Sequence, residues 1–289
     1  LLLIPAIQTP PNFARYGPYP DLVAELSQRE LKGSQFVIDT WLRSQNITVN
    51  YYLRERLPML IDSTSIFHLA RPQSPAALGQ WAEIPTNLVM DDSAADQAAF
   101  AAWLEDADWL YYIAMKNGRS LGADYSDTFR AQIAEAFLWV DSMTFNIPPP
   151  ERPIQLDVYR RIPADLTTIA QVGDDVQLRG WTLLNPVVQP PCAALTLESW
   201  WQVDSPLPDN MSMTFVLADS GGIGVARTDG TPAGIETLLW QPEQPYFDNR
   251  TLVIPCDTAS GEYSLLVGWY DPGGESLGDL VYLTTITVE

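Results

Sequence analysis

The helical hydrophobic pattern in this chain ends at about Pro163, and the apolar segments beyond it are short and strand-like. Before that residue, segments with helical spacing alternate with short apolar runs, a pattern typical of an α/β sheet. After it, clusters of Gly, Pro, Asp and Asn separate the apolar runs, as in all-β domains. The sequence therefore predicts an open, Rossmann-like α/β sheet domain over residues 1–162. An all-β sandwich, immunoglobulin-like or jelly-roll-like, is expected over residues 163–289.

Several segments of the first part carry apolar residues at helical spacing. One helix is expected over residues 21–31 with Gly33 as its stop, and a second is expected after the cap residue Ser93. A third helix is expected to be capped by Ser126 and to continue its apolar face to Val140. The remaining expected elements are a helix over residues 46–56 and strands over residues 35–39, 59–61, 108–114 and 154–159.

The second part shows only strand-like segments. The glycine-rich stretch 220–224 lies between two of them and is interpreted as a hairpin, because a phosphate-binding loop would need a helix N-terminus. The expected strands cover residues 176–184, 194–203, 211–218, 251–254, 263–270 and 280–288.

The formal net charge of the chain is −20, and its isoelectric point is near 4.2. Nucleic acid is not expected as a partner, because phosphate contacts need clustered Lys and Arg. An anionic membrane surface would also repel the chain, so membrane association is expected only through a covalent tether. The apolar run from Leu1 to Ile4 ends at Pro5, and two interpretations stay open: the end of a membrane helix, or a short strand or tail.

The sequence contains no recognisable set of catalytic residues. The single histidine, His68, lies in an apolar run and is interpreted as a core or edge residue. No second His or Cys stands at metal-ligand spacing, and no phosphate-binding or nucleophile motif occurs, so neither a metal nor a cofactor is expected. Adjacent acids such as Asp174 and Asp175 point in different directions on most backbones. The acidic stretch 271–279 is interpreted as a turn rather than a calcium loop.

The two cysteines, Cys192 and Cys256, both fall in the predicted sandwich, next to strand ends. Two cysteines pair without remainder, so a disulfide between them is expected, with two reduced thiols as the alternative. Such a bond would close a loop of about 65 residues and would place the domain in an oxidising compartment.

Trp200 is the aromatic residue expected to bind sugar, if the sandwich binds sugar at all. In the strand 194–203, alternation places Leu195, Leu197, Trp201 and Val203 on an apolar face. Trp200 shares the other, polar face with Glu198 and Gln202, whose side chains could bond sugar hydroxyls. The alternative is that Trp200 packs against the α/β domain or a loop.

The second part also resembles the C-terminal domain of bacterial membrane glycosyltransferases of the GT-C class, related to the dolichyl-phosphate-mannose–protein mannosyltransferases. In that family a "GD-x-L-x-L-x-GY" strand opens the domain and a "Y-x-L-x-V-G-x-Y-D" strand ends it. The segment Asn50-Tyr51-Tyr52-Leu53-Arg54 with Pro58 resembles the region after the last membrane helix of such proteins. The matching residues of the sandwich are Gly173-Asp174, Gly180-Trp181, Tyr263, Leu265, Val267-Gly268 and Tyr270-Asp271, with Trp181 in place of the family's Tyr.

The resemblance implies a non-catalytic extracytoplasmic region of a membrane-anchored parent. In that family such a region is expected to bind the acceptor or to pack on the membrane part of the same chain. The family's catalytic acid and lipid-linked donor site belong to its membrane region, so no catalytic residue is carried over to this chain. Two other functional hypotheses stay open. In these, the chain is either a free-standing extracellular carbohydrate-binding or adhesion module, or a hydrolase with carboxylates at the domain interface.

Overall fold

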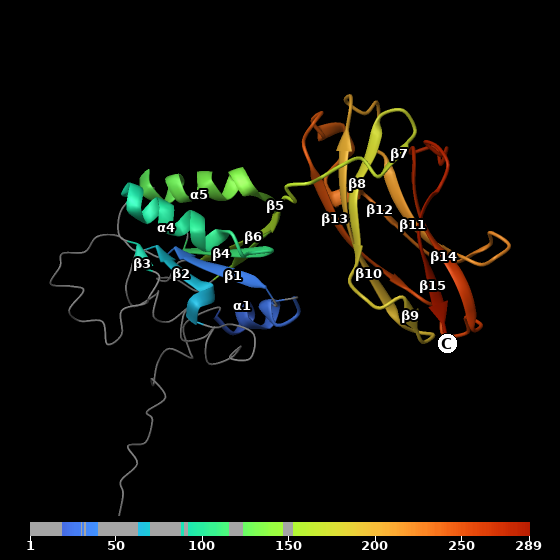
Figure 1. The fold of residues 1–289 in the computed structure, drawn as a ribbon, viewed down its shortest axis with the longest axis horizontal. Helices are drawn as coiled ribbons and strands as arrows, with labels where there is room; N and C mark the ends of the chain where they lie inside the picture. The colour runs from blue at the N-terminus through green and yellow to red at the C-terminus, as the bar shows by residue number, and fades with distance from the viewer. Residues whose placement is uncertain are drawn as a thin grey trace, which may run out of the picture. The chain divides into compact units, whose positions relative to one another are not determined.

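The computed structural model describes residues 19–29, 31, 33–39, 63–69, 88–89, 92–115, 124–146 and 153–289 (Figure 1). The chain forms two compact units, Leu1–Ile162 and Pro163–Glu289. Within the described residues, the expectation of a β-rich chain is confirmed by three sheets. No helix among these residues is long and apolar enough to cross a membrane.

The first unit contains a mixed six-stranded sheet with the strand order β3-β2-β1-β4-β6-β5. The four strands from β3 to β4 run parallel, whereas β6 pairs antiparallel with both β4 and β5. The strands are β1 (Ser34–Asp39), β2 (Ile66–Leu69), β3 (Leu88–Val89), β4 (Trp109–Met115), β5 (Phe137–Phe145) and β6 (Ile154–Arg161), and a 3₁₀ turn, η2 (Ser63–Ser65), precedes β2.

Helices cover both faces of this sheet (Figure 1). Helix α1 (Tyr19–Leu26) packs Leu22 and Leu26 in one core, and α4 (Ala94–Leu104) and α5 (Asp124–Ala136) pack in the other. The strands supply both cores because their side chains alternate between faces: Phe36 and Ile38 face α1, and Val37 faces the other two helices.

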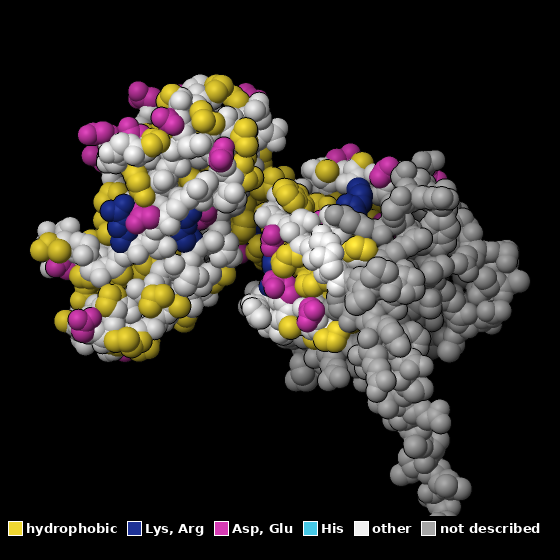
Figure 2. Space-filling model, turned by 180° about the vertical axis from the view of Figure 1, so that it is seen from behind, with side chains coloured by type: hydrophobic (Ala, Val, Ile, Leu, Met, Phe, Trp, Pro, Cys, Tyr) yellow, Lys and Arg dark blue, Asp and Glu magenta, His cyan; other side chains and the backbone are white. Residues whose placement is uncertain are grey.

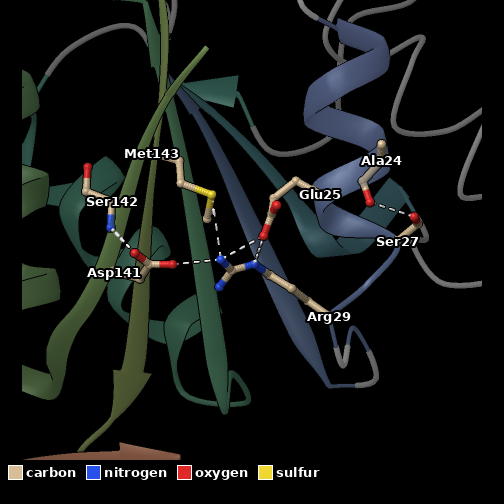
Figure 3. A network of polar contacts seen from close by, with 7 residues as sticks. All are labelled: Ala24, Glu25, Ser27, Arg29, Asp141, Ser142 and Met143. Carbon is tan, nitrogen blue, oxygen red and sulfur yellow. Dashed lines mark hydrogen bonds and ion pairs between the residues drawn. The ribbon is translucent and has the colours of Figure 1, made fainter. Parts of the chain in front are cut away.

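An ionic contact attaches the chain after α1 to the edge strand β5 (Figure 3). Arg29 donates from Nη2 to Asp141 Oδ2 at 2.7 Å and from Nε to Glu25 Oε1 at 3.0 Å. Met143 of β5 lies beside the same guanidinium, with its sulfur 3.8 Å from Nη2. The contact ties together segments that are 112 residues apart in the sequence.

Three helix boundaries differ from the sequence-based expectation. Helix α1 ends at Leu26, and Gly33 instead adopts a positive φ of 74° directly before β1. Ser126 lies inside α5 rather than at its cap, and α5 ends at Ala136. The residues from Phe137 to Val140 belong to β5, where aromatic and β-branched side chains favour the strand and β6 supplies backbone partners.

The cap at Ser93 is confirmed, because its side chain accepts a hydrogen bond from the Asp96 amide at 3.3 Å. The expected strands 35–39, 108–114 and 154–159 correspond to β1, β4 and β6. The expected helix 46–56, the expected strand 59–61 and the segment Leu1–Ile4 lie outside the described residues.

The second unit contains two sheets, with the orders β13-β10-β8-β7 and β12-β11-β14-β15-β9. The pairing is antiparallel except between β15 and β9. The strands are β7 (Ala170–Val172), β8 (Val176–Leu183), β9 (Val188–Gln189), β10 (Ala194–Val203), β11 (Ser212–Ala218), β12 (Gly224–Gly230), β13 (Tyr246–Val253), β14 (Gly261–Tyr270) and β15 (Val281–Val288).

Both sheets bury side chains in one hydrophobic core, with Trp201, Trp240 and Trp269 as its largest members. Trp240 stacks on Tyr246 with ring centroids 3.9 Å apart, and its ring meets Trp269 edge-on. Two short 3₁₀ turns, η3 (Pro232–Gly234) and η4 (Thr237–Leu239), precede β13. The hairpin expected over 220–224 is confirmed between β11 and β12, where Asp219 Oδ1 accepts from the Gly221 and Ile223 amides.

Candidate functional site

A polar cluster lies where the central parallel strands of the first unit end. Asp39 is the last residue of β1, and its Oδ2 accepts a hydrogen bond of 2.6 Å from the Tyr112 hydroxyl on β4. After β1 the chain adds β2 and then β3 on one side of β1 in the sheet. It then adds β4 on the other side of β1, so the strand order reverses between β1 and β4. In α/β sheets, ligands bind at the carboxyl ends of strands where the strand order reverses in this way.

Arg130 of α5 connects the cluster to the antiparallel side of the sheet. Its guanidinium lies 4.0 Å from the centroid of the Tyr112 ring, and its Nη1 lies 3.3 Å from Asp157 Oδ2 on β6. Asp157 also accepts hydrogen bonds at Oδ1 from Ser142 Oγ at 2.7 Å and from Gln155 Nε2 at 2.6 Å. The buried Asp157 carboxylate is thus satisfied by partners from three elements, α5, β5 and β6.

Burial shifts the pKa of both partners in the Asp39–Tyr112 hydrogen bond in the same direction. Burial raises the pKa of Asp39, although the hydrogen bond from Tyr112 and the charge of Arg130 act in the opposite direction. Burial also raises the pKa of Tyr112, so the phenol stays a hydrogen-bond donor. A carboxyl group with a raised pKa keeps its proton to a higher pH, and such perturbed groups gather at functional sites.

Sequence reasoning placed Asp39 only at the end of a strand and missed this cluster. The partners come from β4, α5 and β6, which the sequence does not show to be adjacent. The signal available in the sequence was an acidic residue, Asp39, at the end of a predicted apolar strand.

His68 is a core residue, as the sequence indicated. It is 2% exposed in β2 and lies between Ile38 of β1 and Leu88 of β3 in the pairing register. Burial lowers its pKa to about 4, so the imidazole is neutral at physiological pH. In the part of the chain that the structure describes, no group of three or more His, Cys, Asp and Glu residues is arranged to hold a metal ion.

The face assignment of β10 agrees with the structure, but the exposure expected for Trp200 does not. Leu195, Leu197, Trp201 and Val203 all belong to the core between the two sheets, and Trp200 does not. However, Trp200 is 5% exposed and Glu198 is 4% exposed. An aromatic ring that stacks on a sugar must leave one face open, so the predicted platform is corrected: these residues do not form one here.

Neighbouring residues on the same sheet face account for the burial of Trp200. Its ring lies 5.1 Å from that of Phe247, the residue opposite it on β13. The Trp200 and Leu166 side chains also both lie over Gly180, which has no side chain of its own. The third predicted residue, Gln202, accepts a hydrogen bond from Arg179, whose Nη2 donates to the Leu166 carbonyl at 2.6 Å. The segment before β7 therefore crosses this face, as the loop alternative required.

The predicted disulfide is confirmed. Cys192 and Cys256 are bonded, with Cα atoms 4.3 Å apart and a sequence separation of 64 residues. They flank the paired ends of β10 and β13, where Ala194 lies opposite Val253. The bond therefore closes an existing strand pair.

The first half of the family-like signature contacts Leu277, whose amide donates to the carbonyl of Trp269 in the second half at 2.9 Å. A Cβ atom on Gly173, which has a φ of +61°, would lie 2.6 Å from the carbonyl oxygen of Leu277. Gly268 in the second half has Leu280 directly over its Cα. Asp271 accepts a hydrogen bond from the Glu275 amide at Oδ1 (2.8 Å), so the stretch 271–279 contains the predicted turn. Gly173, Gly268 and Asp271 therefore have structural roles in the second unit.

Comparisons with known proteins do not identify a family. No family model matches the chain, and no curated protein matches it. The solved structures similar to part of it include a Niemann-Pick type C2 protein from the Japanese carpenter ant, at 4% identity and a TM-score of 0.31, covering 43% of this chain and 98% of that one. The C-terminal domain of wzt is similar at 13% identity and a TM-score of 0.29, covering 44% of this chain and 80% of that one. A Bacteroides uniformis beta-glucuronidase has 12% identity and a TM-score of 0.25, covering 47% of this chain and 18% of that one. At these scores the likenesses carry no argument about function.

Proposed function

We propose that this chain is the non-catalytic extracytoplasmic region of a membrane-bound glycosyltransferase of the GT-C class. The observation that supports this proposal is the contact of Gly173, in the first signature segment, with Leu277. Leu277 follows the second signature segment and is bonded to it, because its amide donates to the Trp269 carbonyl at 2.9 Å. Residues of such a signature determine how the unit folds. None of them is proposed to take part in catalysis.

In this proposal the first unit is an open α/β sheet domain and the second is a β-sandwich. The four parallel strands with helices on both faces support the first assignment. The core that the two antiparallel sheets share supports the second.

The proposed location is the extracytoplasmic face of a membrane, with the parent protein anchored in that membrane. The Cys192–Cys256 disulfide supports this location, because disulfides persist in oxidising compartments and are rare in the cytosol. The region then packs on the membrane part of its own chain or binds the acceptor, and it uses no metal or cofactor.

The gene sequence upstream of the codon for Leu1 tests the proposal directly. A glycosyltransferase of this class should encode about ten apolar segments there, each of roughly 20 residues. A signal peptide alone would instead identify a free-standing carbohydrate-binding or adhesion module, and the proposal would be wrong.

A further inference from the structure

The outer face of the five-stranded sheet carries an exposed aromatic ring beside paired polar groups. Met213, Phe215 and Leu217 of β11 point into the core, as do Leu265 and Val267 of β14. Side chains alternate along a strand, so the residues between them lie on the opposite, outer face. Residues of this outer face include Val216, Arg227, Asp229, Leu266, Tyr270 and Tyr282.

Tyr282 is 57% exposed, so it has the open ring that Trp200 lacks. It lies opposite Leu266 in the register of β14 and β15. Its hydroxyl bonds Thr285 Oγ1 at 2.8 Å, three residues further along the same strand. This bond holds the ring along β15 and leaves an apolar surface open to solvent.

A cluster of three polar side chains, Arg227, Asp229 and Tyr270, lies on the same face, over β12 and the end of β14. Arg227 Nη2 lies 2.6 Å from Asp229 Oδ1, and the Tyr270 hydroxyl donates to that same oxygen at 3.2 Å. The Arg227 guanidinium also lies 5.4 Å from the centroid of the Tyr270 ring. Arg227 and Asp229 both reach solvent, and their opposite charges compensate each other.

A continuous row connects the two ends of this face. The register places Arg227 opposite Val216, Val216 opposite Leu266, and Leu266 opposite Tyr282. Three strand spacings separate the ends of the row, about 14 Å in all, which suits a short oligosaccharide. On the side of the second unit drawn in Figure 2, hydrophobic, acidic and basic side chains are interspersed.

We propose that this outer face binds an uncharged oligosaccharide. The C–H face of a sugar ring is apolar and stacks on Tyr282 and Leu266, and the hydroxyls bond the guanidinium of Arg227 and the carboxylate of Asp229. The compensated charges favour a neutral, hydroxyl-rich ligand over an anionic membrane surface. The proposal goes beyond the function proposed above, because the same face would bind glycans in a free-standing module.

Affinity electrophoresis of the purified chain tests this site. The net charge of −20 makes the protein migrate well in native gels, and the gels contain soluble mannan, dextran or hydroxyethyl cellulose as probes. The unmodified chain should be slowed in at least one polysaccharide gel. Tyr282→Ala should weaken this binding about tenfold, and Tyr282→Phe, which keeps the ring, should retain it. Arg227→Met should also weaken it, because the variant loses the hydrogen-bonding group and keeps most of the stem.

Trp139→Ala is the matched control, because Trp139 is a comparably exposed aromatic residue (52%) of β5 in the first unit. This variant should be slowed as much as the unmodified chain. Migration unchanged by all three polysaccharides, or equal retardation of Tyr282→Ala, overturns the proposal. Neither result depends on the upstream sequence, so failure of this site and failure of the proposed function are distinguishable.

Discussion

Gly173 and Leu277 are in contact across 104 residues of sequence (277 minus 173), with no room for a side chain between them. A methyl group on Gly173 would lie 2.6 Å from the Leu277 carbonyl oxygen, and the φ of +61° adds strain for any residue with a Cβ. The turn between β7 and β8 is thereby seated against the stretch 271–279.

Gly173→Ala should therefore lower the free energy of unfolding of the second unit by about 2–4 kcal/mol, as measured by denaturant unfolding. Gly222→Ala is the matched control, since Gly222 also has a positive φ (+78°) but has no atom within 4 Å of the position that the alanine methyl group would occupy. The control should cost only about 1 kcal/mol, the strain of the left-handed backbone. Equal costs for the two variants would show that the contact with Leu277 does not matter.

The Cys192–Cys256 bond should contribute about 4 kcal/mol to the stability of the second unit, the loop-entropy value for its separation of 64 residues. Reduction with a thiol should shift the denaturant midpoint of this unit downward. The Cys192→Ser, Cys256→Ser double variant should already be destabilised and should not respond to the thiol. An unchanged midpoint after complete reduction would contradict the prediction.

His68 should make the first unit sensitive to acid. Its pKa is about 4 in the folded chain and 6.5 without the fold, so the unfolded state takes up the proton first as the pH falls. Stability is therefore lost between pH 6.5 and 4, by up to about 3 kcal/mol. In His68→Gln, the loss over this pH window should be smaller by that amount. The slope of the stability with pH is the readout, and the same slope in both proteins would refute the assignment.

Asp39 should affect stability in the opposite direction. Its folded-state pKa is raised by burial, so the unfolded state loses the proton first as the pH rises above 3.8, and stability falls. Asp39→Asn keeps an oxygen that can accept the Tyr112 hydroxyl hydrogen bond and removes the buried charge. The variant should be more stable than the unmodified chain at about pH 7, and the difference should shrink as the pH falls toward 3.8. A less stable variant at neutral pH would mean that Arg130 more than compensates the buried carboxylate.

Local patterns predicted those elements whose burial alternates or recurs regularly. Strand β10 was predicted with its observed bounds, because its apolar residues alternate and its core face is fully buried. Strand β12 was missed, since the edge sequence GVARTDG is polar and mostly exposed or half-buried. Strand β5 was expected to be helical because Phe137 continues the apolar spacing of Phe129 and Ile133, and all three enter the same core.

The candidate sites depend on contacts that no local pattern contains. The faces of β10 were predicted, but the burial of Trp200 follows from Phe247 on the neighbouring strand and from the crossing of Leu166 near Gly180. The Asp39 cluster likewise forms only when β1, β4 and α5 come together. Tyr282 gave no signal in the sequence, because its exposure results from the register of β14 and β15.

The most direct measurement of the central claim is an assay of the purified 289-residue chain with a lipid-linked sugar donor and with aryl glycosides. The proposal that this is a non-catalytic region of a glycosyltransferase predicts no turnover of either substrate. It also predicts that membranes containing the whole parent protein transfer sugar from the lipid-linked donor. Turnover by the purified chain, lost when a single acid such as Asp39 is replaced, would contradict the account.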